Sequence, residues 1–334
     1  MEKPLPNKLY SYLATVKALL LILALNSVSL QAAWVDHKFP VMGTEIRMMF
    51  WLADPNQAEL AKQAVIDEMH RINQTMSPWI EESILSKVNK AAATHPVKVS
   101  DEFFDIIKSS QEISSLTRGA FDITFSSVGY LYDYRAAKKP TASQLKEKLN
   151  LINYRSIILD EKNKTIAYSK PGVKIDLGGI AKGLAVDNSI NKLKSFGVKD
   201  ASVTAGGDTY VLGDNAGKMW RIGIKHPRAE NKMVSILPVA DMAVSTSGDY
   251  ERFFIEDGKR HHHIINPKTG QSVLGVQSVT ILADNSTYAD ALSTSVFVLG
   301  VQKGLELVNS LKDVSAIIVD SRGKMFYSKD LEQI

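Results

Sequence analysis

The chain has 334 residues, of which 45% are hydrophobic and 23% charged, which is enough apolar material for a substantial core and excludes a disordered protein. Its 40 basic and 36 acidic side chains give a formal net charge of +4 without a dense basic cluster, which argues against nucleic-acid binding. Because there is no cysteine, disulfides, thiol catalysis and a lipid-modified N-terminal cysteine are excluded.

The first thirty residues have the pattern of a secretory signal peptide. Three lysines precede the apolar run ALLLILAL (residues 18–25), which small and polar residues follow. The run is short for a membrane span, and the alternatives are a buried N-terminal helix or an uncleaved signal that anchors the protein. We therefore expect a signal peptide over residues 1–29, with a boundary as late as about 33, an exported protein, and a single domain over 34–334.

The next part of the chain alternates between strand and helix periodicity. The expected elements are a strand over Thr44–Leu52, a helix over 56–75 capped by Asn56, a short helix ending near Asn89, and a helix over 101–116 capped by Asp101.

Strand patterns dominate from residue 174 onwards. We expect strands in VKIDL, ASVTAG, DTYVLG, WRIGIKH, MAVSTSG, HHHIINP, SVTILA and AIIVDS, and helices over about 179–196, 287–298 and 301–311. Strand hairpins with inserted helices, and no regular βαβ alternation, predict an α+β fold with mixed, mostly antiparallel sheets.

The stretch KIDLGGIAKG (Lys174–Gly183) carries a carboxylate, two adjacent glycines and a lysine where a strand is expected to lead into a helix. Its spacing fits neither the P-loop nor the dinucleotide fingerprint. Asp176 and Lys182 beside a helix N-terminus could address a phosphate or nucleotide. The alternative is a glycine-rich connection in which Asp176 caps the helix.

A second candidate lies in STYADALSTSVFVLG. Asp290 and Thr294 are four residues apart and therefore share one face of a helix. A carboxylate and a hydroxyl on an otherwise apolar helix suit a divalent cation that takes oxygen ligands. The alternative is that Asp290 caps the helix and Thr294 bonds back to a carbonyl.

Two further stretches carry candidate side chains. In HHHIINPKTG, His261 and His263 point to one face of an extended chain and His262 to the other. Zinc is disfavoured because further ligands are missing, so a histidine here is a proton acceptor or an exposed edge residue. In TRGAFDIT, Phe121 beside Asp122 could line a ring-binding pocket or belong to an ordinary core.

The ordered series of motifs resembles the ApbE-type FAD:protein FMN transferases over nearly all of the expected mature chain. The motifs are MGT at Met42–Thr44, SPW followed by Asn89, TRGAFDIT, KIDLGGIAKG, TAGGD at Thr204–Asp208, HHIINPKTG and ADALST. The resemblance implies an ApbE-like, T-fold-like architecture, in which two subdomains could hold FAD between them. It also implies Mg²⁺-dependent transfer of FMN from FAD to a Ser or Thr hydroxyl of an acceptor protein through a phosphoester, with release of AMP.

The resemblance also implies roles for individual residues. The flavin-nucleotide contacts would be Met42, Trp79, Ala120, Phe121, Asp122, Asp176, Lys182 and Ile264. The metal ligands would be the Gly179 carbonyl, Asp290 and Thr294, with Ser293 as a further contributor; His263 would be the general base, and Asn89 matches a position associated with whether FAD is turned over or held.

The sequence departs from the family pattern at two places. Trp79 stands where a tyrosine is more usual, and ITFSSVGYLYDY follows GAFD in place of a proline-containing run. Two other functions stay open: a metal-dependent FAD pyrophosphatase giving FMN and AMP, and a non-catalytic exported FAD-binding protein. The resemblance further implies acceptor subunits of membrane redox complexes, of the Na⁺-translocating NADH:quinone reductase or Rnf type, and a location in the periplasm or at the periplasmic face of the inner membrane.

Overall fold

A computed structural model describes residues 33–332, so the expected signal peptide lies outside the described residues. An eight-stranded sheet forms the centre of the fold, and each neighbouring pair of its strands is antiparallel. In spatial order the strands are β1 (Ala33–Val41), β2 (Thr44–Leu52), β6 (Ala201–Ala205), β7 (Asp208–Leu212), β10 (Met242–Gly248), β13 (Val276–Ala283), β14 (Ser315–Asp320) and β15 (Met325–Tyr327).

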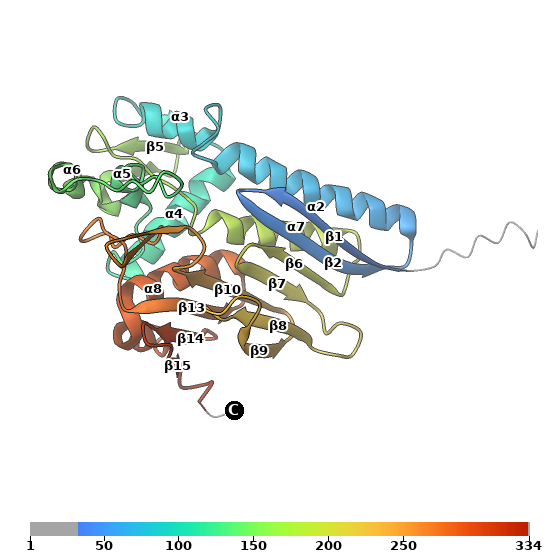
Figure 1. Cartoon of the computed structure of the whole chain (residues 1–334). Coiled ribbons are helices and arrows are strands. Elements are labelled where there is room, and N and C mark those ends of the chain that lie inside the picture. Colours follow the sequence, from blue (N-terminus) through green and yellow to red (C-terminus); the bar gives the residue numbers. More distant parts are fainter. Residues whose placement is uncertain (1–32, 333–334) are drawn as a thin grey trace, which may run out of the picture.

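Three helices cover one face of this sheet (Figure 1). Helix α2 (Pro55–Met76) packs on β1 and β2, α7 (Ala181–Ser195) on β6 and β7, and α8 (Ser286–Val308) on β10 and β13. The contact buries large side chains of β2 such as Met48 and Phe50, and removing them from water is the main force that holds these layers together. The hairpin of β8 (Trp220–Lys225) and β9 (Met233–Val239) packs on the other face of the sheet.

A second group of elements lies beside the helices. It contains α3 (Ile84–Ala91), α4 (Asp101–Leu116), α5 (Ser126–Gly129), α6 (Ala142–Lys148), the 3₁₀ turns η1 (Ile123–Phe125), η2 (Leu149–Leu151) and η3 (Tyr154–Ser156), and a sheet of β3 (Val97–Lys98), β5 (Thr165–Tyr168) and β4 (Ile157–Asp160). Phe103 and Ile166 of this group are buried in the same apolar cluster as β2 and α7. The domain boundaries stay a prediction.

The expected α+β class is confirmed, but both expected helix caps are wrong by one or two residues. Asp54 caps α2, since its Oδ1 accepts a hydrogen bond from the Asn56 N–H at 2.8 Å, and Pro55 takes the first helical position. Ser100 caps α4 through a 3.3 Å hydrogen bond from the Phe103 N–H. In both cases the cap is the residue that precedes the first helical residue.

The expected strand VKIDL is also wrong. The side chain of Asn89 occupies both backbone groups of Ile175: its Nδ2 donates to the carbonyl at 2.9 Å, and its Oδ1 accepts from the N–H at 2.8 Å. The Asp176 N–H donates to the Ile123 carbonyl at 2.9 Å. A side-chain amide and a loop therefore take the hydrogen bonds that a neighbouring strand would make. The expected strand HHHIINP ends earlier than predicted, because β12 stops at His262.

Helix α8 covers the helix expected over about 287–298 and most of the one expected over 301–311, which ends earlier, at Val308. A break occurs at Gly300, where φ is 77°. Among the described helices it is the one long and apolar enough to cross a membrane by length and composition. It packs on the sheet beside α7 and carries buried polar residues such as Asp290, as expected for a core helix.

Candidate active site

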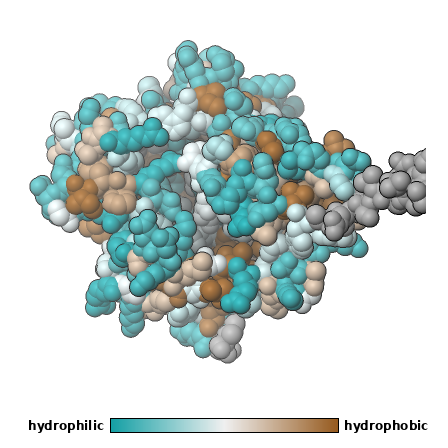
Figure 2. Space-filling model, turned by 45° about the vertical axis from the view of Figure 1, so that its right-hand side comes forward, coloured by the Kyte–Doolittle hydropathy of each residue, from teal (hydrophilic) through white to brown (hydrophobic). Residues whose placement is uncertain are grey.

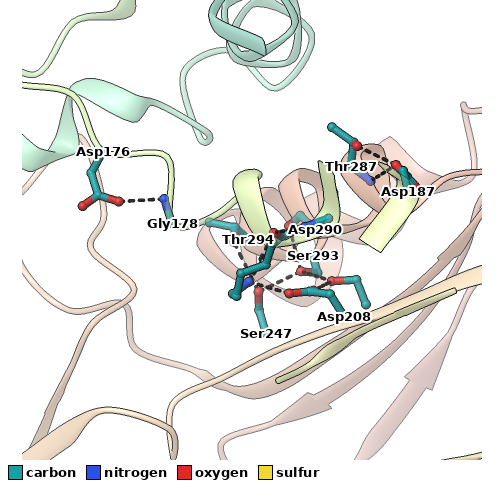
Figure 3. Close-up of polar contacts among 12 residues, drawn as sticks. Asp176, Gly178, Asp187, Asp208, Ser247, Thr287, Asp290, Ser293 and Thr294 are labelled. Carbon is teal, nitrogen blue, oxygen red and sulfur yellow. Dashed lines mark hydrogen bonds and ion pairs between the residues drawn. The ribbon is translucent and has the colours of Figure 1, made fainter. Parts of the chain in front are cut away.

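Two buried carboxylates, Asp208 and Asp290, lie close together where the N-terminus of α7 meets α8 (Figure 3). Lys182 lies between them. The Nζ of Lys182 is 2.5 Å from Oδ2 of Asp208 and 3.2 Å from Oδ2 of Asp290. Burial disfavours the charged lysine, but the two carboxylates outweigh burial and raise its pKa. With both carboxylates ionised, this group of three side chains has a net charge of −1.

Asp290 connects the two helices. Its pKa is raised, first by burial and then by the neighbouring charge of Asp208. Its Oδ2 accepts a 3.2 Å hydrogen bond from the N–H of Gly183, in the first turn of α7, where Ile180 supplies no side-chain cap. The alternative that Asp290 caps its own helix is therefore wrong: Asn285 caps α8, and Asp290 satisfies an N–H of α7.

Hydroxyl groups of β10 and α8 extend this cluster. Ser245 donates to Oδ1 of Asp208, and Ser247 is hydrogen-bonded to Ser293 at 2.8 Å and to Thr294 at 3.2 Å. Ser245 and Ser247 reach α8 together because alternate residues of a strand point to the same face. We call Lys182, Asp208, Asp290 and these four hydroxyl residues the α7/α8 polar cluster.

Gly179 lies directly against this cluster. A Cβ atom at this glycine would lie 3.2 Å from Oγ1 of Thr294 and 3.4 Å from the ring of Phe121. Asp176 lies on the adjoining loop, where its Oδ1 accepts a 2.6 Å hydrogen bond from the Gly178 N–H, and burial raises its pKa. The fold therefore brings Gly179 and Thr294 together although they are more than a hundred residues apart in sequence.

His263 follows the hairpin of β11 (Phe253–Glu256) and β12 (Lys259–His262). Its Nδ1 is buried and has no hydrogen-bond partner within the part of the chain that the structure describes. Burial, followed by the charges of Arg252, His262 and Lys182, lowers its pKa to about 3. The imidazole is therefore neutral at physiological pH.

The neighbouring histidines have other roles. Nε2 of His262 is hydrogen-bonded to the Val273 carbonyl at 2.7 Å, and the ring of His261 stacks on Phe254 with centroids 5.0 Å apart.

Two residues near the site were not singled out in the sequence. Asp208 lies in the TAGGD motif, and only the folded chain shows that it shares Lys182 with Asp290. Arg252 has its guanidinium 3.1 Å from the position of a Cβ at Gly43, and its positive charge lowers the pKa of His263 and opposes the rise in the pKa of Asp176. The only sequence signal for the cluster's β10 contribution is the run of three consecutive hydroxyl residues in MAVSTSG.

The other expected nucleotide contacts differ in how far they are exposed. Met42 lies on the turn before Gly43, with φ of 56°, while Ala120, Phe121 and Ile264 are buried. Trp79 is 86% exposed and has little contact with the rest of the protein.

Asp122 is bound locally, because its two oxygens accept from Thr124 N–H, Thr124 Oγ1 and Tyr154 N–H at 2.6 to 2.9 Å. The flavin roles of Trp79, Asp122 and the other expected nucleotide contacts stay predictions.

The face of the protein shown in Figure 2 is mostly hydrophilic and has a hollow near the centre of the view. A groove of about 660 Å³ lies along the β1–β2 hairpin and is lined by residues 38–41 and 43–45. Gly43 belongs to this groove and also approaches Arg252. The groove is therefore next to Arg252 but does not include the α7/α8 polar cluster among its lining residues.

The donor set of the cluster suits a hard cation. Residues 33–332 contain no group of three or more histidines, aspartates or glutamates that could hold a metal ion. The set expected from the motifs is instead one carboxylate, one hydroxyl and one backbone carbonyl, an all-oxygen set of the kind that Mg²⁺ binds with water or substrate phosphate in its other positions. With both Asp208 and Asp290 ionised, Lys182 leaves one negative charge uncompensated, which also fits an additional cation.

Fold and cluster together define an α+β enzyme whose polar groups suit reactions of phosphate esters or anhydrides. The chain belongs to the ApbE family, whose model matches residues 42–318. An FAD:protein FMN transferase of Klebsiella pneumoniae is 31% identical over 283 residues, covering 84% of this chain and 87% of that protein. Another from Haemophilus influenzae is 35% identical over 247 residues, covering 71% of each chain.

Solved structures agree with this assignment. The crystal structure of the ApbE protein of Thermotoga maritima has a TM-score of 0.83 and 34% identity, and the match covers 90% of this chain and 99% of that one. The flavin transferase ApbE of Vibrio cholerae has a TM-score of 0.80 and 26% identity, covering 91% and 99%. The expected ApbE-like architecture is therefore confirmed.

Proposed function

We propose that this flavin transferase moves FMN from FAD to a Ser or Thr hydroxyl of an acceptor protein and releases AMP. Its relatives are FAD:protein FMN transferases, which supports the general activity. The finer proposal is carried by one observation: Gly179, Lys182, Asp290 and Thr294 meet at the junction of α7 and α8, within electrostatic range of a neutral His263.

The proposed reaction exchanges one phosphorus–oxygen bond for another. The acceptor hydroxyl oxygen forms a bond to the FMN phosphorus, the bond from that phosphorus to the bridging oxygen breaks, and AMP leaves with the bridging oxygen. The hydroxyl proton passes to His263, whose free Nδ1 can accept it. The low pKa of His263 makes it a weak base in the free protein, and the negative charge of a bound diphosphate would raise that pKa.

We propose that Asp290, Thr294 and the Gly179 carbonyl hold Mg²⁺. When bound, the ion would neutralise charge on the diphosphate and polarise the bond that breaks. Lys182 supplies a positive charge at the same junction, and Arg252 supplies another near His263 and Asp176. Both cations can orient a diphosphate and stabilise the charge that develops on it.

The test incubates the purified protein with FAD and Mg²⁺, with and without an acceptor protein, and follows flavin by in-gel fluorescence and mass. Flavin bound covalently to the acceptor supports transfer, whereas free FMN and AMP without labelled acceptor indicate hydrolysis. Unchanged FAD under all conditions would contradict both reactions.

Single substitutions test the metal and the base. Asp290→Asn should abolish Mg²⁺-dependent turnover. Asp320→Asn, which changes a buried carboxylate at the end of β14, two strands away from β10, should retain it. His263→Ala should slow transfer far more than it weakens FAD binding. Equal losses of binding and turnover would contradict a base role for His263.

We also propose that the protein is exported and acts in the periplasm or at the periplasmic face of the inner membrane. The lysines and apolar run of residues 1–25 support this proposal. The proposed acceptors are subunits of membrane redox complexes of the Na⁺-translocating NADH:quinone reductase or Rnf type. Cell fractionation and a search for flavinylated membrane subunits in a strain lacking the protein test both points.

A further inference from the structure

Helices α7 and α8 contact each other in a regular series that ends at the proposed metal ligands. Gly179, just before α7, faces Thr294; Gly183 donates to Asp290; and Asp187 binds the first turn of α8. Moving four residues towards the C-terminus of α7 corresponds to moving about four residues towards the N-terminus of α8. This spacing is one helical turn on each helix, so the contacts form successive layers of an antiparallel helix pair.

The layer at Asp187 holds the two helices firmly. Its Oδ1 accepts from the Ser286 N–H at 2.8 Å, and its Oδ2 accepts from the Thr287 N–H at 2.8 Å and the Thr287 hydroxyl at 2.5 Å. These donors lie at the N-terminus of α8, where backbone N–H groups have no partner within their own helix. In Figure 3 the contact between Asp187 and Thr287 lies apart from Thr294, at the N-terminus of α8.

The layer at Gly183 brings the two backbones unusually close. A Cβ atom at Gly183 would lie 2.3 Å from the Ser286 carbonyl oxygen, so even alanine would force the helices apart. Gly183 therefore permits the close approach, and Asp187 fixes its register. Because Asp290 lies one turn beyond this contact on α8 and Thr294 two turns beyond it, a shift at Asp187 would move both proposed ligands relative to Gly179.

We propose that Asp187 is a positioning residue, which keeps α8 in register with α7 so that Asp290 and Thr294 face the Gly179 carbonyl. This inference rests on the proposed function, because it concerns the affinity of that same site for a divalent cation. Asp187 touches neither the proposed metal nor the substrate, and its effect is transmitted through the first turn of α8. A residue that only added stability would not change the affinity of the folded protein for Mg²⁺.

The test measures Mg²⁺ affinity of the full chain by isothermal titration calorimetry, well below the unfolding temperature, together with the Tm of each variant. Asp187→Ala should weaken Mg²⁺ binding by about 10- to 100-fold, the usual effect of losing a group that orients metal ligands. Asp187→Asn keeps one accepting oxygen, so its affinity for Mg²⁺ should lie between those of the wild type and Asp187→Ala. Gly183→Ala, which pushes α7 away from the same first turn of α8, should also weaken Mg²⁺ binding.

Asp320→Ala is the matched control. Asp320 is also buried and also accepts two backbone hydrogen bonds, from Arg322 at 2.8 Å and Lys324 at 2.9 Å, but it lies on β14. The Asp320→Ala substitution should lower the Tm and leave the affinity for Mg²⁺ unchanged. The proposal is overturned if Asp187→Ala lowers the Tm as the control does but binds Mg²⁺ within twofold of wild type. If Asp187→Ala does not fold, Asp187→Asn decides by the same criterion. Absence of Mg²⁺ binding by wild type would overturn both this proposal and the metal dependence of the proposed function.

Discussion

Replacement of His263 by glutamine should remove a specific pH dependence of stability. Burial, reinforced by the charge of Arg252, lowers the pKa of His263 from 6.5 to about 3. Between these values the unfolded chain binds a proton that the folded protein does not, so the free energy of unfolding falls as the pH falls, by about 1.36 kcal/mol per pH unit. Above pH 6.5 the neutral His263 causes no loss of stability. At pH 5 the free energy of unfolding is lower by about 2 kcal/mol.

The assay is urea denaturation of the wild type and of His263→Gln between pH 5 and pH 8. The difference in free energy between the two proteins should change by about 2 kcal/mol over this range, because the variant has no group with this shifted pKa. His95→Gln, which changes an exposed histidine, is the control and should follow the wild type. NMR titration provides a direct check. If the resonance lost in His263→Gln titrates with a midpoint near 6.5 in the wild type, the account of its buried neutral state is refuted.

Substitutions at three further positions test the site's structure. Gly179→Ala should be tolerated with a small shift of Thr294, because the new Cβ would lie 3.2 Å from Oγ1 of Thr294. The larger side chain of Gly179→Val should lower the affinity for Mg²⁺ in a calorimetric titration. Asn89→Ala leaves the N–H and carbonyl of Ile175 without their partner and should cost about 2–4 kcal/mol in urea denaturation. Arg252→Gln should raise the KM for FAD more than it lowers kcat if the guanidinium binds the diphosphate, and an unchanged KM would contradict that role.

Local patterns in the sequence predicted much of the fold. The long helices had clear apolar periodicity, and the observed ranges of α2 and α4 agree with the expected ones within one or two residues. The segment VKIDL failed because its hydrogen bonds go to Asn89, which lies 86 residues away from Ile175. No propensity or alternation within a short window contains that partner, so an extended apolar segment was read as a strand.

The site was predictable only in part. The spacing of Asp290 and Thr294 places them on one face of a helix without further information. Their proximity to Gly179 depends on how α7 packs against α8, and only the resemblance to a family pointed to it. Arg252 had no sequence signal, because only the folded chain brings it near Asp176 and His263.

The contacts of Asp290 determine which substitution gives a clear answer. Asp290 satisfies the Gly183 N–H, shares the Lys182 ammonium with Asp208, and is a proposed metal ligand. Asp290→Ala would leave a buried N–H unpaired, at a cost of about 1–3 kcal/mol, so lost activity could follow from a displaced α7 alone. Asp290→Asn retains an oxygen for the Gly183 N–H and removes the charge that attracts a cation. If the asparagine variant keeps the wild-type Tm but loses Mg²⁺ affinity, the carboxylate acts on the metal itself; unchanged Mg²⁺ affinity would remove Asp290 from the ligand set.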